Sequence, residues 1–272
     1  MNLTEPYSRY LRLLGFSSPP SGLDGLRALV REHLFRVPFE NVSKILLIKR
    51  EGRGRVTSLT EFMDGIEYHD LGGTCYTNNP HLFELLRVLG YDADLLAADM
   101  TNPNVHTCIR VRLDSAEYHI DVGFGAPFSE PVALSRLPHE IRSGAVRYVL
   151  DRNAAPGEYE MAVWRESERI HRYVVHGPPR DCEYFRQTVE ASYLPGTTFM
   201  TWLRIGRFFE DHSVDLIDRK IKIHRGGQTR EIQLKSMKEM RAAVDNELCM
   251  PRCPVEEAVE VMERMNARKF FG

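Results

Sequence analysis

Apolar residues in the first third of the chain recur at the three- and four-residue spacing of amphipathic helices. A first stripe, ended by Gly15, comprises Tyr7, Tyr10, Leu11 and Leu14. A second, with Ser21 or Asp24 as its cap, comprises Leu26, Leu29, Val30, His33 and Leu34. Further helical patterns begin at Thr60 and follow Cys75, where Gly90 ends the apolar face. Residues 1–90 are therefore predicted to form a helical bundle.

The pattern changes from Tyr91 onwards to the alternation that is typical of strands. The segments concerned are His106–Leu113, Tyr118–Val122, Arg147–Leu150, Tyr159–Trp164 and Ile170–Val175. Residues 91–194 are therefore predicted to form an antiparallel sheet or barrel. Residues 195–272 mix both patterns, with strands at Lys220–His224 and Thr229–Leu234 and helices at Lys235–Asn246 and Val255–Met265. The whole chain is expected to be an α+β protein in three parts.

Composition narrows the range of partners. The 272 residues are 43% hydrophobic, and 36 Lys and Arg against 38 Asp and Glu give a net charge of −2. This balance gives no indication of nucleic acid or an acidic membrane as a partner. No apolar run reaches the length of a membrane span, and the first residues lack the pattern of a signal peptide. We expect a cytoplasmic monomer or weak homo-oligomer.

Cysteine usage agrees with that compartment. Five cysteines are spread over a long chain, which suits a reducing environment better than a disulfide framework. Cys249 and Cys253 are separated by three residues and have no second Cys or His pair nearby, so no metal site is expected.

One ordered set of residues carries candidate chemistry. Cys75 follows two glycines, His106 begins a predicted strand, and Asp121 precedes Val122-Gly123-Phe124-Gly125. A thiol, an imidazole and a carboxylate can form a nucleophilic triad in which the thiol becomes a reactive thiolate. Taken singly, each residue is better explained as a buried structural side chain. The combination favours a catalytic role for Cys75, His106 and Asp121.

Strand geometry relates two members of this set. If Asp114-Ser115 is a two-residue hairpin turn, paired residue numbers sum to 229 and Asp121 lies opposite Cys108. His106 and Asp121 then share one face as diagonal neighbours, within reach of each other's side chains. The opposite face is nearly all apolar and is expected to face the core, whereas a register slip of one residue would separate the pair.

The position of Cys75 allows two interpretations. If a helix begins at Cys75, its partial positive charge favours the thiolate, but Pro80 then lies inside the helix and removes a hydrogen bond. If Asn79 instead caps a helix that starts at Pro80, Cys75 lies in the preceding loop and His106 must provide most of the activation.

The ordered motifs resemble those of the arylamine N-acetyltransferase family over roughly residues 5–245. In this chain they are Pro38-Phe39-Glu40-Asn41, Leu71-Gly72-Gly73-Thr74-Cys75, His106, and Asp121-Val122-Gly123-Phe124-Gly125. Pro195-Gly196-Thr197-Thr198-Phe199 is similar to a further family segment, Pro-x-Ser-x-Phe. The resemblance implies a helical bundle that carries the cysteine, a β-barrel that carries His and Asp, and a C-terminal α/β lid. The first two parts of this fold are like those of papain-type cysteine proteases.

The same resemblance implies a two-step acyl transfer with ping-pong kinetics and a role in xenobiotic metabolism. Cys75 would take an acetyl group from acetyl-CoA, and an arylamine, hydrazine or N-hydroxyarylamine would then accept it. His106 would move the protons and Asp121 would orient it. No metal is implied.

The resemblance also implies binding residues. Gly123 and Gly125 would let the backbone approach the thioester or the pantetheine arm, and Thr197 would hydrogen-bond CoA. Val37, Phe39 and Phe124 would border the acceptor pocket, where aromatic side chains suit a flat amine.

Two departures from the family pattern concern the surroundings of the cysteine. The family's Arg before Gly-Gly is Leu71, so Glu40 loses the cation that the family offers it. The family's Glu two residues after the cysteine is Thr77, whereas its Asn is kept as Asn79. Three other interpretations stay open, and the two departures favour the last of them. They are an amide synthase with the same triad, a papain- or transglutaminase-like hydrolase, and a degenerate non-catalytic binding protein.

Overall fold

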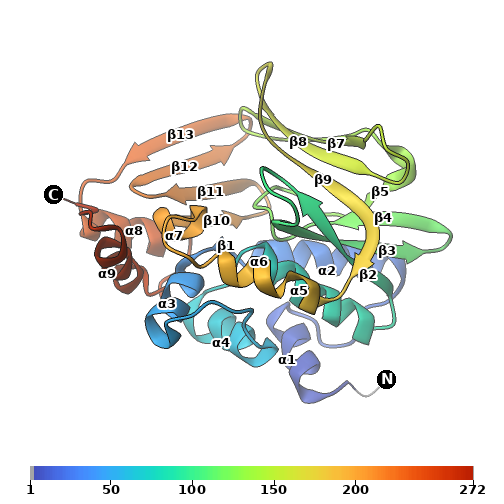
Figure 1. The fold of residues 1–272 in the computed structure, drawn as a ribbon, viewed down its shortest axis with the longest axis horizontal. Helices are drawn as coiled ribbons and strands as arrows, with labels where there is room; N and C mark the ends of the chain where they lie inside the picture. Colours follow the sequence, from blue (N-terminus) through green and yellow to red (C-terminus); the bar gives the residue numbers. More distant parts are fainter. Residues whose placement is uncertain (1–2, 272) are drawn as a thin grey trace.

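Helices make up most of the N-terminal part of the protein. The computed structural model describes residues 3–271 (Figure 1). The first five helices are α1 (Glu5–Leu13), α2 (Gly22–Arg36), α3 (Val42–Glu51), α4 (Leu59–His69) and α5 (Cys75–Val88). Four of them confirm the predicted amphipathic stripes. The sequence did not predict α3, which begins after Asn41 and ends at Gly52 in the left-handed conformation (φ 68°).

The central part of the chain forms an eight-stranded antiparallel sheet that curls into a nearly closed barrel. Its order is β5-β4-β3-β2-β9-β8-β7-β6. These strands are β2 (Asp92–Asp99), β3 (His106–Leu113), β4 (Ala116–Ile120), β5 (Val132–Ala133), β6 (His139–Ser143), β7 (Val146–Arg152), β8 (Tyr159–Arg165) and β9 (Glu168–Arg180). The predicted antiparallel barrel and the α+β class are confirmed.

A second sheet lies between the barrel and the C-terminal helices (Figure 1). It has the order β1-β10-β11-β12-β13. Its strands are β1 (Phe39–Glu40), β10 (Arg204–Phe208), β11 (His212–Ile217), β12 (Lys220–Arg225) and β13 (Gln228–Gln233). The remaining helical segments are η1 (Leu134–Arg136), η2 (Cys182–Phe185), α6 (Arg186–Ala191), α7 (Thr198–Thr201), α8 (Met237–Asn246) and α9 (Val255–Asn266). Because β1 comes from the N-terminal part, this sheet joins the two ends of the chain.

Three apolar clusters hold the layers together. The helices pack on one face of β2–β4, the barrel encloses a second cluster, and a third fills the space between the five-stranded sheet, α3, α8 and α9. Each fully buried aliphatic or aromatic side chain contributes roughly 1.5–3 kcal/mol to this packing. Within residues 3–271, no helix is both long and apolar enough to cross a membrane.

The hairpin that relates His106 to Asp121 has the predicted register. Ile109 pairs with Ile120 and Leu113 with Ala116, so the paired numbers sum to 229. Asp114 and Ser115 have φ values of 50° and 62°, as a two-residue type I′ turn requires. Both faces of the hairpin are buried, however, because the helices cover the apolar face and the barrel interior covers the face that carries His106.

Candidate active site

Cys75 is the first residue of α5, and Thr74 is the N-cap residue. The helix runs through Pro80, so the alternative in which Asn79 caps a later helix is wrong. Thr74 accepts hydrogen bonds from the backbone of Thr77 and Asn78, which closes the first turn directly behind the thiol. The sulfur therefore lies where the partial positive charge of the helix N-terminus favours a thiolate.

The glycines around Cys75 are required by close backbone contacts. A Cβ atom on Gly72 would lie 2.1 Å from the carbonyl oxygen of Pro38. A Cβ atom on Gly123 would lie 2.6 Å from the Cα atom of Cys75. No larger residue fits at either position without movement of the backbone, so these glycines set the distance between the Cys75 helix, the Pro38 segment and the loop after Asp121.

His106 and Asp121 form a buried hydrogen-bonded pair. The distance from His106 Nε2 to Asp121 Oδ2 is 2.8 Å, and the side chains are 2% and 0% exposed. The carboxylate accepts three further hydrogen bonds, from Asn79 Nδ2 at 2.9 Å, Tyr173 OH at 2.8 Å and the Gly123 backbone at 3.0 Å. With Nε2 engaged, Nδ1 is the ring nitrogen left for the Cys75 thiol.

Electrostatics keep this pair charged. Burial disfavours the imidazolium, but the charge of Asp121 and its hydrogen bond outweigh that cost and raise the pKa of His106 to about 10, with a further contribution from Cys75. Burial likewise opposes ionisation of Asp121, yet the His106 charge and the surrounding donors lower the pKa of that carboxyl. The arrangement can therefore hold a carboxylate and an imidazolium beside the thiol at neutral pH.

Two residues support the pair in ways that the sequence pattern did not reveal. Asn79 donates to the carbonyl oxygen of Thr107 and to Asp121, and it accepts from the Val122 backbone. It thus ties α5 to both sides of the hairpin. Tyr173 of β9 reaches across the barrel to Asp121, and its ring centroid lies 4.7 Å from that of His106. In the predicted strand Ile170–Val175, the alternation of side chains between the two faces could have identified Tyr173 as a residue that faces the barrel interior.

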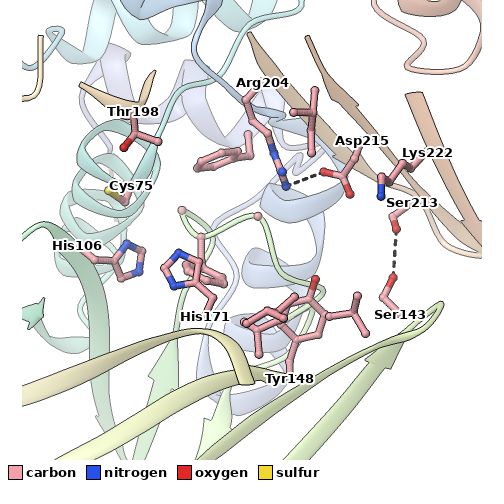
Figure 2. A pocket seen from close by; sticks show the side chains of 18 of the residues that line it. Cys75, His106, Ser143, Tyr148, His171, Thr198, Arg204, Ser213, Asp215 and Lys222 are labelled. Atoms are coloured by element: carbon pink, nitrogen blue, oxygen red, sulfur yellow. Dashed lines mark hydrogen bonds and ion pairs between the residues drawn. The ribbon is translucent and has the colours of Figure 1, made fainter. Parts of the chain in front are cut away.

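A cavity of about 330 Å³ opens in front of the thiol (Figure 2). This volume lies within the usual range for a small-molecule site. Cys75 and His106 lie at one end, and the residues at the other end include Arg204, Asp215, Lys222, Ser143 and Ser213. The aromatic part of the lining comes from Phe39, Phe124, Tyr148, Phe199 and Trp202.

The cavity contains most of the residues expected to bind substrates. Gly123, Phe124, Gly125 and Phe39 line it. Val37 does not, because it is 3% exposed and packs in the helical core. The hydroxyl of Thr197 donates to the carbonyl oxygens of Ser192 and Leu194, whereas its neighbour Thr198 lines the cavity.

The departures from the family pattern have local explanations. Glu40 is fully buried and accepts hydrogen bonds from the backbone of Ser43 at 2.8 Å and of Gly72 at 3.1 Å. Burial raises the pKa of this carboxyl despite these donors. Leu71 packs in the aliphatic cluster beneath the five-stranded sheet. Thr77 fills the space beside Gly73, where an added Cβ atom would lie 2.6 Å from the Thr77 side chain.

No group of three or more His, Cys, Asp or Glu side chains among the described residues is arranged to hold a metal ion. Cys108 lies on the same strand face as His106 and is not assigned a catalytic role. It is fully buried, and burial raises the pKa of its thiol well above the usual range. A neutral, buried thiol of this kind is a poor nucleophile.

Proteins similar to this chain in sequence and in structure include N-acetyltransferases. The sequence model of the N-acetyltransferase family matches residues 22–250. The arylamine N-acetyltransferase of Mycolicibacterium smegmatis is 27% identical over 251 residues, covering 87% of this chain and 89% of that protein. The Nocardia farcinica arylamine N-acetyltransferase structure is 25% identical, with a TM-score of 0.77 and coverage of 94% and 93% of the two chains.

A second solved structure is that of the Mycobacterium marinum arylamine N-acetyltransferase in complex with CoA. It has a TM-score of 0.79 at 21% identity and covers 95% of this chain and 99% of that one. At this identity the match concerns the fold, and it agrees with the expected papain-like core of helical bundle and barrel, followed by an α/β lid.

Proposed function

Because the chain belongs to the arylamine N-acetyltransferase family of acyltransferases, we propose that Cys75 accepts the acetyl group of acetyl-CoA and passes it to an aromatic amine, hydrazine or N-hydroxyarylamine. The observation that carries the proposal is the buried Asp121–His106 pair beside a thiol at a helix N-terminus. A single chain carries every residue involved, so we propose that the monomer is the acting unit.

In the first half-reaction the Cys75 thiolate attacks the thioester carbonyl, and the tetrahedral intermediate collapses with loss of the CoA thiolate. His106, held as imidazolium by Asp121, donates the proton that this leaving group needs. The products are acetyl-Cys75 and free CoA. Gly123 and Gly125, which line the cavity without side chains, leave room for the pantetheine arm. Thr198, rather than the engaged hydroxyl of Thr197, is the threonine available to CoA.

In the second half-reaction the amine nitrogen attacks the acetyl carbonyl of Cys75. Neutral His106 takes the proton from the nitrogen, and the Cys75 thiolate leaves, which restores the starting ion pair. Phe39, Phe124 and Phe199 provide flat apolar surfaces for an aromatic acceptor. We infer a role in the acetylation of foreign aromatic amines, in a reducing cytoplasm that keeps the five free cysteines unpaired.

The acetyl-enzyme is the species that tests this proposal. Incubation with acetyl-CoA and no amine should add the mass of one acetyl group, release one equivalent of CoA, and place the label on Cys75 in peptide mapping. Cys75→Ser should not form this thioester, whereas Cys249→Ser, which removes an exposed thiol, should be labelled normally. An unlabelled wild-type protein would contradict the proposal. Release of acetate without an amine would favour a hydrolase, and an absence of CoA affinity would favour the amide synthase.

A further inference from the structure

The far end of the cavity is polar, in contrast to its aromatic walls. We propose that Arg204 binds an anionic ring substituent, so that the preferred acceptors are aromatic amines bearing a carboxylate or a similar charged group. This inference rests on the proposed function, because it concerns the acceptor of the second half-reaction.

The position of Arg204 is fixed by the sheet and by one ion pair. Arg204 of β10 lies opposite Ile217 of β11, so Asp215, two residues away on β11, is its diagonal neighbour on the same face. Arg204 Nη2 donates to Asp215 Oδ1 at 2.7 Å. The Arg204 backbone donates to Asn41 Oδ1 at 2.7 Å, which anchors this end of the strand to the start of α3. The guanidinium is therefore held in place before any ligand arrives.

The guanidinium lies beside the loop that follows Asp121. An added Cβ atom on Gly125 would lie 3.8 Å from Arg204 Nη2. The neighbouring residue Phe124 contacts the His106 ring edge-on, with 5.6 Å between the ring centroids. In Figure 2 the guanidinium points into the space between the Cys75–His106 end of the cavity and Asp215. An aromatic ring stacked along Phe124 could thus present an amine to Cys75 and a substituent to Arg204.

Arg204 keeps donors that Asp215 does not use. In the described part of the chain, the bond to Asp215 is the one side-chain hydrogen bond of Arg204, and its Nε atom is buried without an acceptor. A guanidinium has five N–H donors in a planar fork that suits a carboxylate. A ligand carboxylate could therefore accept hydrogen bonds from guanidinium N–H groups that Asp215 does not engage.

The charge of the lining favours an anion over a cation. Leaving the histidines aside, the charged side chains of the described lining are Arg165, Arg204 and Lys222, which are positive, and Asp215, which is negative. Asp215 stays ionised, because Arg204 and His224 lower the pKa of its carboxyl despite burial. Asp215 thus offsets one of the three positive charges, and Glu231, outside the lining, pairs with Lys222. The lining keeps an excess of positive charge, which attracts a negatively charged substituent.

Arg204 could also bind the phosphates of CoA. The two half-reactions distinguish these ligands, because acetyl-CoA reacts in the first and the aromatic amine in the second. The preformed acetyl-enzyme is mixed with 4-aminobenzoate or with its neutral analogue 4-aminobenzamide, and the loss of the acetyl label is timed. The wild-type protein should prefer the aminobenzoate. Arg204→Met should lower this preference by about 10- to 100-fold, the usual effect of a charge-assisted hydrogen bond.

Two further variants distinguish recognition from a structural ion pair. Asp215→Asn removes the charge that neutralises Arg204, so it should raise the preference for the aminobenzoate. Arg165→Met removes an exposed cation at the rim and should change the preference by less than about threefold. If Arg204→Met and Asp215→Asn shift the preference in the same direction, the pair is structural and the proposal is wrong.

Three other outcomes overturn the proposal. In the first, the wild-type protein is deacetylated at equal rates by the two amines. In the second, Arg204→Met slows deacetylation by both amines equally. In the third, Arg204→Met slows the acetylation of Cys75 by acetyl-CoA as much as it slows deacetylation, which would assign Arg204 to the CoA phosphates. If the wild-type protein forms no acetyl-enzyme, the proposed function fails by itself. The quenching of Trp202 fluorescence by benzoate and by benzamide then still measures whether Arg204 selects the anion.

Discussion

Replacing Asp121 by asparagine removes a charge from the site with almost no change of shape. The carboxylate accepts four hydrogen bonds, two on each oxygen. Asparagine has one oxygen, so its NH2 group must face either Asn79 and Gly123 or His106 and Tyr173, all of which donate. The substitution therefore removes the counter-charge of His106. It also places an NH2 donor either against the donors of Asn79 and Gly123, or against His106 and Tyr173, which can accept it only by giving up the hydrogen bonds that they now donate.

The pKa of His106 gives the size of the effect. A rise from 6.5 to about 10 corresponds to about 5 kcal/mol in favour of the imidazolium, most of which depends on Asp121. Without that charge, burial favours the neutral ring, and the thiolate loses its partner. We expect acetylation of Cys75 by acetyl-CoA at pH 7 to slow by about 10³- to 10⁴-fold, as in other triads whose carboxylate is replaced by an amide.

The assay combines rapid-quench mass spectrometry of acetyl-Cys75 with alkylation by iodoacetamide, which reports the thiolate without a cofactor. Both rates should fall together in Asp121→Asn. The stability profile gives an independent check, because the raised pKa of His106 stabilises the folded state fully below pH 6.5 and loses that effect as the pH rises towards 10. Asp121→Asn should flatten this part of the profile. A folded variant that is alkylated within tenfold of the wild-type rate would refute the reasoning.

Three further predictions concern packing, titration and support of the pair. Gly123→Ala should lower the free energy of unfolding by about 1–3 kcal/mol and abolish acetylation, because its Cβ atom would lie 2.6 Å from Cys75 Cα. Gly65→Ala is the control, because Gly65 lies in α4 and an added Cβ atom would have normal contacts there, so this change should raise the free energy of unfolding. If urea titrations show that Gly65→Ala lowers the free energy of unfolding as much as Gly123→Ala, this account is wrong. Burial lowers the pKa of His33 to about 3, so its protonation in the unfolded chain should cost about 2 kcal/mol of stability between pH 6.5 and pH 5. His33→Leu should remove that part of the acid sensitivity in urea titrations at the two pH values, and an unchanged slope would speak against it. Tyr173→Phe should slow acetylation about tenfold by removing one charge-assisted hydrogen bond to Asp121, whereas an unchanged rate would mean that the remaining donors suffice.

The parts of the fold that the sequence predicted are those that depend on local periodicity. The register of the β3–β4 hairpin followed from a two-residue turn and from alternation, and it placed His106 and Asp121 correctly. The pairing of β1 with β10 joins residues far apart in the chain, for example Phe39 with Gly206, and no local sequence pattern predicts it. The distal end of the cavity depends on that sheet, which is why Arg204 and Asp215 were not predicted from the sequence.

Strand parity predicted only one of the two faces of the hairpin. The apolar face was expected to lie against the core, and it does, whereas the alternation did not indicate what covers the polar face. In the structure the polar face is buried as well, because the barrel wraps around it and Tyr159 and Tyr173 satisfy His119. A polar residue on a strand is thus compatible with burial wherever another strand supplies its hydrogen-bond partner.

The missing arginine at position 71 gives a last test of how the site is supported. From the sequence, Glu40 appeared to lack a cation. In the structure its carboxylate accepts from the backbone of Ser43, in the first turn of α3, and from Gly72. The helix N-terminus and these donors take the place of a positive charge, although the raised pKa of Glu40 shows that they do not fully offset burial.

Restoring the arginine should therefore harm this protein. Leu71 is 6% exposed and packs among aliphatic side chains, so Leu71→Arg would bury a guanidinium against them. We expect the free energy of unfolding in urea to fall by at least about 2 kcal/mol. Leu71→Met, which keeps the volume apolar, should cost less than about 1.5 kcal/mol. A more stable Leu71→Arg variant would mean that Glu40 still requires a cation. The backbone donors that hold its carboxylate would then be an incomplete substitute.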